Sequence, residues 1–148
     1  MISVKFIILL LVAYMLGNIS PSTILAKAKG IDIKKAGSGN AGTTNALRVL
    51  GGKAAAITLV IDIGKGFLAG MFLNPMQVSF CALAVFLGHV WPVLIKFKGG
   101  KGVATAFGAI LALNWQLALI CLGIVALVVI VTRMVSLGSV TAALAFPF

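Results

Sequence analysis

Two glycine-rich, basic segments of the chain have the composition of anion-binding loops. The first loop comprises residues 37–45, with the sequence GSGNAGTTN, and the second loop comprises residues 96–102, with the sequence KFKGGKG. Glycine leaves backbone N–H groups uncovered and lysine adds positive charge, which suits both loops to binding a phosphate. Both lie between apolar stretches that give access to lipid. The leading hypothesis is therefore a phosphate-handling step on a lipid.

The first loop matches two nucleotide-binding patterns in spacing only. It fits G-x-G-x-x-G, but residues 31–35 before it are too few and too charged to form the buried strand of such a site. A Walker loop is excluded because Thr43 stands where its lysine belongs. What remains is a loop of backbone donors, with a flexible polar connector as the alternative. The candidate phosphate-binding residues here are Gly37, Ser38, Gly39, Asn40, Gly42, Thr43, Asn45 and, about a turn along a possible helix, Arg48.

The second loop comes just before residues 103–105, where a helix N-terminus would offer unpaired N–H groups to a ligand. An anchor on anionic lipid headgroups is the alternative, and it explains the lysines but not the glycines. The candidate phosphate-binding residues of this loop are Lys98, Gly99, Gly100, Lys101 and Gly102.

Four further polar residues lie within or beside apolar runs. Asp62 and Lys65 are three residues apart, so one helix face can hold both as an ion pair, and structural pairing is the favoured role. For His89, the single histidine, an interhelical hydrogen bond is the first expectation and contact with substrate the second. Ser139 is either a substrate-binding residue or part of a helix contact.

The composition indicates an integral membrane protein. Of the 148 residues, 61% are hydrophobic and 9% are charged, and the mean hydropathy of +1.20 lies outside the range of a soluble domain. The net charge is +10, but the basic residues lie in short loops between apolar runs. Anionic lipid or a phosphorylated substrate is therefore the expected partner, rather than nucleic acid. No metal site is expected, since Cys81 and Cys121 lie in apolar runs without metal-ligand spacing.

The apolar runs predict an all-α, polytopic membrane protein with about six membrane segments in a single domain, residues 1–148. The fourth run would reach only about 16 Å as a helix, against a hydrocarbon core of about 30 Å. We favour two segments separated at Asn114 over one tilted helix across residues 103–131, because Asn114 and Gln116 flank an interfacial Trp115. The expected segments are residues 4–26, 54–73, 76–95, 103–113, 115–132 and 135–148.

The distribution of basic residues predicts the orientation. They are concentrated in the breaks at residues 27–53, 96–102 and 133, so the positive-inside rule places both glycine-rich loops in the cytoplasm and the N-terminus outside. Within the second segment, Gly66 and Gly70 form a small-residue face for close helix packing.

Four blocks of sequence also carry a family resemblance. They are AGSGNAGTTNALR at residues 36–48, DIGKG at 62–66, GHVWP at 88–92 running into KFKGGKGVAT at 96–105, and TRMVSLGS at 132–139. In this order and over essentially its whole length, the chain resembles the PlsY family of bacterial glycerol-3-phosphate acyltransferases. The resemblance implies a multi-pass enzyme of the bacterial inner membrane. Such an enzyme transfers a fatty acyl group from acyl phosphate to the 1-hydroxyl of sn-glycerol 3-phosphate, giving lysophosphatidic acid and inorganic phosphate.

The resemblance further implies roles for particular residues and partners. Ser38 and Arg48 match residues needed for activity, and residues 99–102 match a glycerol 3-phosphate-binding loop. A soluble acyl-phosphate synthase would supply the donor, membrane lipid would surround the enzyme, and no cofactor is expected. Family members have seven spans and end in a segment with an Arg-His and an Asn. This chain stops before that segment, at AFPF in residues 145–148, and is expected to be C-terminally truncated.

Acyl transfer to an alcohol needs a proton acceptor and a stabiliser for the oxyanion. The chain has no Glu, and Asp62 is expected to pair with Lys65, so the phosphate of the substrate itself is the favoured acceptor. Glycine N–H groups, Ser38, Arg48 and Lys101 would hold the two phosphates. A Ser38 acyl-enzyme, a phosphate or organic-phosphate transporter and an inactive membrane scaffold are the alternatives. The candidate catalytic residues are Ser38, Asn40, Arg48, His89 and Lys101.

Overall fold

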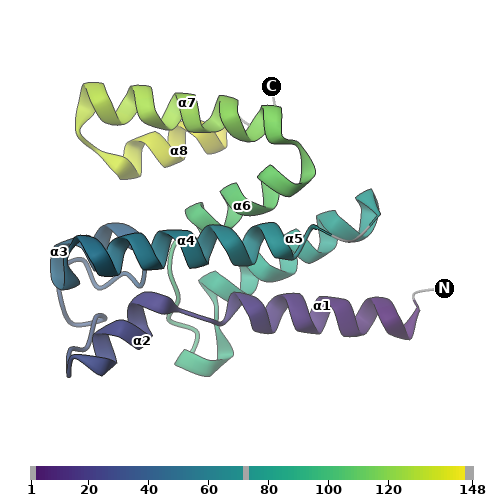
Figure 1. Cartoon of the computed structure of the whole chain (residues 1–148), viewed down its shortest axis with the longest axis horizontal. Helices are drawn as coiled ribbons and strands as arrows, with labels where there is room; N and C mark the ends of the chain where they lie inside the picture. Colours follow the sequence, from purple (N-terminus) through teal and green to yellow (C-terminus); the bar gives the residue numbers. More distant parts are fainter. Residues whose placement is uncertain (1–2, 72–73, 146–148) are drawn as a thin grey trace. The chain divides into compact units, whose positions relative to one another are not determined.

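The computed structural model describes residues 3–71 and 74–145, which form helices joined by loops (Figure 1). The chain divides into two compact units, Met1–Leu113 and Asn114–Phe148. The prediction of an all-α membrane protein is confirmed, and the single domain stays a prediction. The helices of the first unit are α1 (Val4–Gly17), α2 (Pro21–Ala28), α3 (Thr43–Leu50), α4 (Gly52–Leu68), α5 (Pro75–Val90), the 3-10 helix η1 (Val93–Ile95) and α6 (Val103–Leu113). The second unit contains α7 (Trp115–Thr132) and α8 (Val135–Ala145).

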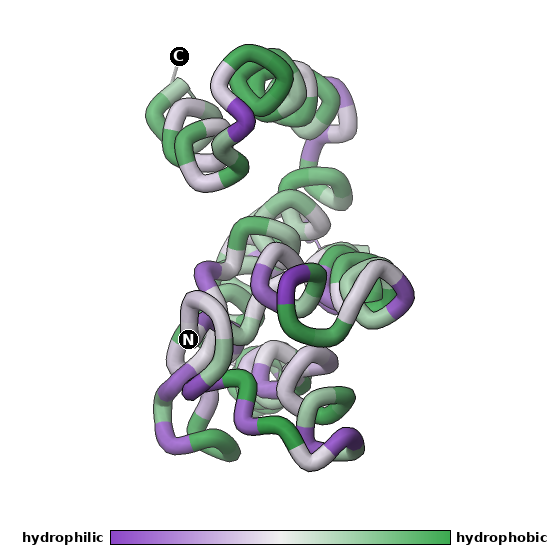
Figure 2. The backbone as a smooth tube through the Cα atoms, turned by 90° about the vertical axis from the view of Figure 1, so that its left-hand side faces the viewer, coloured by the Kyte–Doolittle hydropathy of each residue, from purple (hydrophilic) through white to green (hydrophobic). Residues whose placement is uncertain are grey.

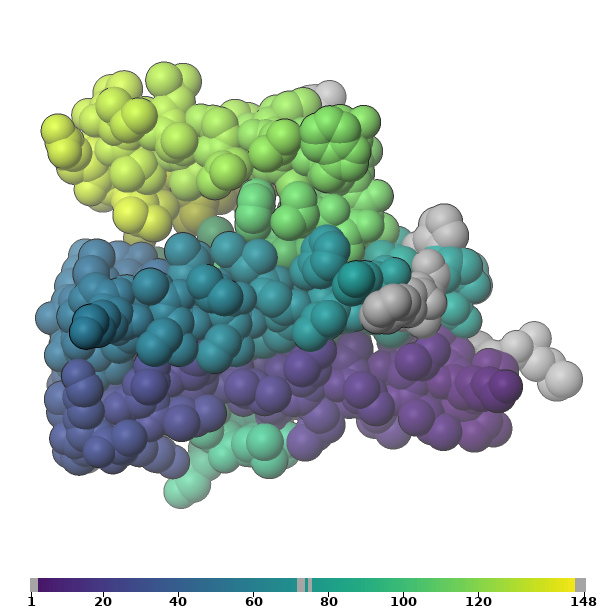
Figure 3. Space-filling model, in the orientation of Figure 1, coloured from purple at the N-terminus to yellow at the C-terminus, as the bar shows by residue number. Residues whose placement is uncertain are grey.

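Glycines allow two pairs of helices in the first unit to pack backbone against backbone. A Cβ on Gly66 of α4 would overlap the Thr105 carbonyl oxygen of α6, and one on Gly70 would lie 2.8 Å from the Ala112 Cβ. The predicted small-residue face is therefore confirmed. In the same way α1 packs on α5, where a Cβ on Gly88 would overlap the Tyr14 carbonyl oxygen. α2 packs against both α4 and α3 (Figure 3).

The first predicted span, residues 4–26, is divided into two helices, α1 and α2, whose axes differ by 41°. That the pair forms one span stays a prediction. Pro21 explains the break, because it has no N–H to donate to the carbonyl four residues earlier, that of Gly17. Asn18 then ends α1, and α2 starts with Pro21 at its first turn, a position that proline favours.

The predicted break at Asn114 is confirmed, and the single helix across residues 103–131 is wrong. α6 ends at Leu113, and the Asn114 side chain accepts a hydrogen bond from the Leu117 N–H (3.0 Å), which caps the start of α7. In the second unit α7 turns at Arg133, in the left-handed region with φ +59°, and packs against α8.

Apolar residues run along the helices of both units (Figure 2). Residues Met76–Ile95 and Trp115–Thr132 are each long and apolar enough to cross a membrane, and the bent pair of α1 and α2 would be a third such span. α6 and α8 are shorter apolar helices. The count of about six segments stays a prediction, and the predicted segment ends at residues 73 and 148 lie outside the described residues, as do residues 146–148 of the terminal AFPF.

Candidate active site

Asn45 holds the first loop together from within. It lies in the first turn of α3 and only 2% of it is exposed. Its Oδ1 accepts a hydrogen bond from the Ser38 N–H (2.8 Å), and its Nδ2 donates to the carbonyls of Ile33 (3.3 Å), Ala36 (3.1 Å) and Asn40 (3.0 Å). The polar atoms of this side chain are therefore used to shape the loop. The sequence predicted Asn45 as a ligand-binding residue instead.

The Asn45 side chain leaves room only for glycine at position 37. Gly37 adopts φ +60°, a conformation that favours glycine, and a Cβ there would overlap the Asn45 Oδ1. The loop thus closes around Asn45 only because the residue opposite it has no side chain.

The first loop leaves a set of polar groups for a ligand. Ser38 is exposed, and Arg48 is exposed in the last turn of α3. The N–H groups of the first turn of α3 have no carbonyl partner within the helix. Within the described part of the chain, Asn40 Oδ1 and Thr43 Oγ1 are buried without a hydrogen-bond partner. Buried polar atoms are rarely left unpaired, so these two atoms fit a site that is completed by a ligand.

The second loop is held from outside, by the end of α5. Gly99 N–H donates to the Val90 carbonyl and Gly100 N–H donates to the His89 carbonyl, both at 3.1 Å. A Cβ on Gly99 would overlap both of these carbonyl oxygens. The sequence predicted that these glycines let the backbone approach a ligand, whereas their amides satisfy the last carbonyls of a helix. Lys98 and Lys101 are exposed on this loop.

The two loops meet at Lys34. Its Nζ donates to the Gly99 carbonyl (2.7 Å), and the Ala41 carbonyl oxygen lies 3.1 Å from where a Cβ on Gly100 would be. The pKa of Lys34 lies below its usual 10.5 because burial disfavours the charged form; Asp32 acts against this shift and Lys98 adds to it. Sequence reasoning missed this lysine, because nothing in the spacing indicates that position 34 faces position 99.

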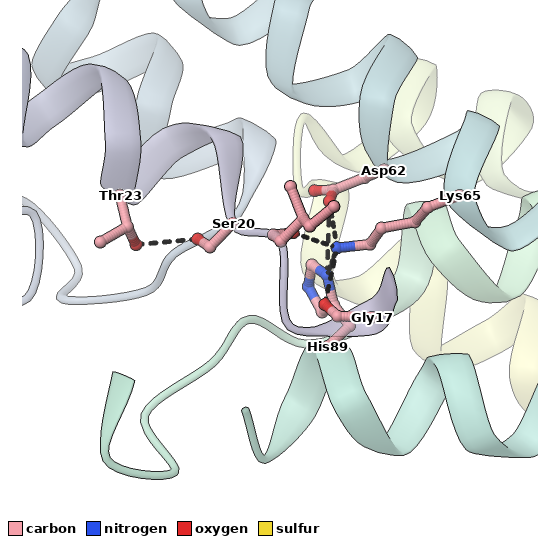
Figure 4. A network of polar contacts seen from close by, with 7 residues as sticks. Gly17, Ser20, Thr23, Asp62, Lys65 and His89 are labelled. Carbon is pink, nitrogen blue, oxygen red and sulfur yellow. Dashed lines mark hydrogen bonds and ion pairs between the residues drawn. The ribbon is translucent and has the colours of Figure 1, made fainter. Parts of the chain in front are cut away.

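Beneath the second loop lies a buried cluster that we call the Lys65 cluster, formed by Asp62, Lys65 and His89 (Figure 4). The Lys65 Nζ is 2.8 Å from Asp62 Oδ1 and 2.8 Å from His89 Nδ1, and the latter is 3.4 Å from Asp62 Oδ1. The same ammonium donates to the carbonyls of Gly17 (3.1 Å) and Ile19 (2.7 Å). The spacing of Asp62 and Lys65 predicted their pairing, but not that His89 joins them.

The family model described as Glycerol-3-phosphate acyltransferase matches residues 7–148. The chain belongs to this family. The predicted resemblance is thereby confirmed, and so is the prediction of an acyltransferase of the membrane.

Individual relatives agree with the family match. A glycerol-3-phosphate acyltransferase of Clostridioides difficile (strain 630) is 47% identical, over 92% of this chain and 72% of the relative. One of Geotalea daltonii is 44% identical, over 96% of this chain and 76% of the relative. A crystal structure of PlsY, an integral membrane glycerol 3-phosphate acyltransferase, in its glycerol 3-phosphate form has a TM-score of 0.91 at 37% identity, covering 96% of this chain and 74% of that one. The lysophosphatidic acid form of PlsY has a TM-score of 0.87.

Most of the predicted site residues lie in the first unit. Ser139 lies in the second unit, on α8, where its hydroxyl donates to the Ser136 carbonyl (2.9 Å). Its role in substrate binding stays a prediction. Among residues 3–71 and 74–145, no group of three or more His, Cys, Asp or Glu side chains is placed to hold a metal ion.

Proposed function

We propose that the chain transfers a fatty acyl group from acyl phosphate to the 1-hydroxyl of sn-glycerol 3-phosphate. The observation that carries this proposal is the junction of the two loops, where the Lys34 Nζ binds the Gly99 carbonyl. It brings the exposed groups of the first loop to the same part of the molecule as the lysines of the second. The names of the relatives, and the glycerol 3-phosphate and lysophosphatidic acid forms of the solved PlsY, support this choice of acceptor and product.

The two loops offer complementary groups to two phosphates. Ser38, Arg48 and the N–H groups at the start of α3 would bind one phosphate, and Lys98 and Lys101 would bind the other. The amides of Ser38, Gly39, Gly99 and Gly100 already donate to partners within the protein. We therefore assign Gly37, Gly39, Gly99, Gly100, Gly102 and Asn45 to shaping the loops, and Asn40, Gly42 and Thr43 to the surface facing the substrate.

The reaction proposed is substrate-assisted. The 1-hydroxyl oxygen attacks the acyl carbonyl carbon, its proton passes to the 3-phosphate of the same substrate, and the carbon–oxygen bond to the donor phosphate breaks. Asp62 and His89 are 2% and 5% exposed and belong to the Lys65 cluster, so we assign the proton to the substrate phosphate. Arg48 and the lysines stabilise the charge that develops on the oxyanion and the leaving phosphate.

The acyl chain would lie against the apolar surface of α2 and α4. A hollow of about 120 Å³ is present there, and burial of acyl carbons would contribute about 0.8 kcal/mol per CH₂. Its lining residues are Ile19, Pro21, Ile24, Leu25, Ile57 and Ile61. We further propose that the protein lies in the bacterial inner membrane, with both loops cytoplasmic and the N-terminus outside. There a soluble acyl-phosphate synthase can deliver the donor.

A donor comparison tests the proposal. The purified chain in lipid is given glycerol 3-phosphate with acyl phosphate, acyl-CoA or acyl carrier protein. A chimera that adds the part of the Clostridioides difficile relative left out of the match is assayed in parallel. Of the three donors, we expect only acyl phosphate to give lysophosphatidic acid, with one phosphate released for each lysophosphatidic acid formed. Equal product from acyl-CoA would refute the assignment of the donor.

An acceptor comparison tests the substrate-assisted step. Glycerol 3-phosphate is replaced by its phosphonate analogue, which keeps a dianion, or by a neutral diol of similar shape. The phosphonate should be acylated and the diol should not, because the diol carries neither the charge that binds nor the group that accepts the proton. Undiminished turnover of the diol would rule out this mechanism.

A further inference from the structure

The break between α1 and α2 leaves carbonyl groups that the helices themselves cannot satisfy. The Gly17 carbonyl would normally accept a hydrogen bond from residue 21, but that residue is Pro21 and has no N–H. Lys65 of α4 supplies the donor to Gly17, and it also donates to the carbonyl of Ile19. A side chain from a distant helix thus fixes the shape of the break (Figure 4).

The same ammonium fixes the state of His89. An ammonium group only donates hydrogen bonds, so with Lys65 charged the His89 Nδ1 at 2.8 Å is the acceptor, and Nε2 is the nitrogen that faces away from Lys65. Asp62 Oδ1, 2.8 Å from the Lys65 Nζ, balances the charge. The two carbonyls and the His89 ring are the three hydrogen-bond partners of the ammonium, and Asp62 supplies the opposite charge.

The other edge of the His89 ring faces the second loop. His89 Nε2 occupies the place that a Cβ on Gly100 would take, and the Ala41 carbonyl oxygen of the first loop lies 3.1 Å from that same point. The Nε2 edge of the ring is therefore directed at the junction of the two loops.

A second connection joins the break to the second loop. Asn18 Oδ1 accepts a hydrogen bond from the Leu94 N–H (3.1 Å) in η1, and the Tyr14 hydroxyl donates to the Trp91 carbonyl (2.8 Å). Trp91 and Leu94 both lie in the segment between α5 and the second loop. A change in the break would therefore be transmitted to the loop.

We propose that Lys65 is a positioning residue for the acyl transfer, acting through the α1 and α2 break and through the Nε2 edge of His89 to hold the second loop against the first. The inference rests on the proposed function, because the loops are the proposed phosphate site. A buried ion pair is weak evidence for a role in stability, since replacing such a pair with well-packed apolar residues often leaves the folded protein equally or more stable. The contacts of Lys65 with two carbonyls and an imidazole favour a geometric role instead.

Two substitutions of His89 separate this role from simple packing. His89→Gln places an amide near the position of Nε2, and His89→Asn places one near the position of Nδ1. We expect His89→Gln to keep the KM for glycerol 3-phosphate within about threefold of wild type, and His89→Asn to raise it by about tenfold or more. Equal KM values in the two variants, or a lower KM in His89→Asn, would overturn the proposal.

A paired substitution tests Lys65 itself. Asp62→Asn combined with Lys65→Met removes both charges together, so that no unpaired charge stays buried. With Lys53→Met as the control on the same helix, we expect the double variant to raise the KM for glycerol 3-phosphate by about tenfold or more and to leave the KM for acyl phosphate unchanged. A folded double variant with the wild-type KM would overturn the inference while leaving the proposed function intact. If the double variant does not fold, the His89 pair decides. If neither the wild-type chain nor the chimera with the Clostridioides difficile relative formed lysophosphatidic acid, both proposals would be overturned.

Discussion

The two glycine-rich loops have similar composition, but different parts of the protein hold them in shape. The first loop folds around the side chain of Asn45, which bonds four backbone groups within residues 33–40. The second loop is bound mainly through its own amides to the last carbonyls of α5, with the Lys34 side chain at the Gly99 carbonyl as an added contact. The glycines of the first loop thus make room for a side chain, and those of the second make room for another backbone.

This difference determines what each loop can offer a substrate. The first loop presents Ser38, Arg48 and a helix N-terminus, and the second presents Lys98 and Lys101 from a backbone that is fixed by α5. The first loop therefore supplies directional hydrogen-bond donors, whereas the second supplies positive charge from a backbone that α5 holds in place.

The largest effect is expected in the second loop, from Gly99→Ala. The new Cβ would overlap the carbonyl oxygens of His89 and Val90, which belong to backbone that cannot move aside cheaply. We expect acyl transfer to fall by about a hundredfold or more, since small misplacements of binding groups have effects of this size. Gly52→Ala is the control, because a Cβ there meets nothing within 4 Å. Wild-type turnover by Gly99→Ala would show that α5 does not fix the loop.

In the first loop, Asn45→Ala should reduce both stability and activity. Each backbone group that loses its partner in the interior costs about 1–3 kcal/mol. We expect a lower thermal unfolding midpoint together with a raised KM for acyl phosphate, the substrate that is left to the first loop when residues 99–102 bind glycerol 3-phosphate. The exposed Gln116 of α7 provides the control substitution, Gln116→Ala. If Asn45 instead touched the substrate, the KM would rise while the unfolding midpoint stayed the same.

At the junction, Lys34→Met should have a smaller effect. It removes one hydrogen bond to the Gly99 carbonyl from a half-buried position. Since such a bond contributes about 1 kcal/mol, the KM for glycerol 3-phosphate should rise by about three- to fivefold, with kcat little changed. Lys34→Arg, which retains a donor, should restore most of the affinity. A fall in kcat alone would contradict a role in joining the loops.

The smallest effect concerns pH. The pKa of Lys34 is lowered in the folded protein, so between that pKa and 10.5 the unfolded chain binds more protons than the folded chain. The contribution of Lys34 to stability should therefore rise with pH across this window and fall as pH drops through the folded pKa. The difference in unfolding midpoint between wild type and Lys34→Met, measured from neutral pH to about 10.5, tests the sign. If the wild-type midpoint minus the Lys34→Met midpoint decreased with rising pH, the expected sign would be wrong.

Local patterns predicted much of the fold. The break at Asn114 and the close packing at Gly66 follow from residue types that act on their own neighbours. The break between α1 and α2 was missed although Pro21 gave the signal, because the apolar run continues through it and the donor that replaces the missing bond comes from Lys65, far along the chain.

The site was less predictable for the same reason. Composition identified both loops and the residues they expose, and the i, i+3 spacing identified Asp62 and Lys65. The inward role of Asn45 and the contact of Lys34 with Gly99 depend on the path of the chain in three dimensions. No local spacing specifies which amides are used by the protein and which are left for a ligand.

The most direct test of the account is the formation of lysophosphatidic acid from acyl phosphate and glycerol 3-phosphate by the purified protein in lipid, with Arg48→Ala compared to Lys53→Ala. Both substitutions remove an exposed positive charge, but only Arg48 lies in the proposed site. We expect Lys53→Ala to retain wild-type activity and Arg48→Ala to lose about ten- to a hundredfold, the value of a charge-assisted hydrogen bond to phosphate. Equal activity of the two variants would contradict it.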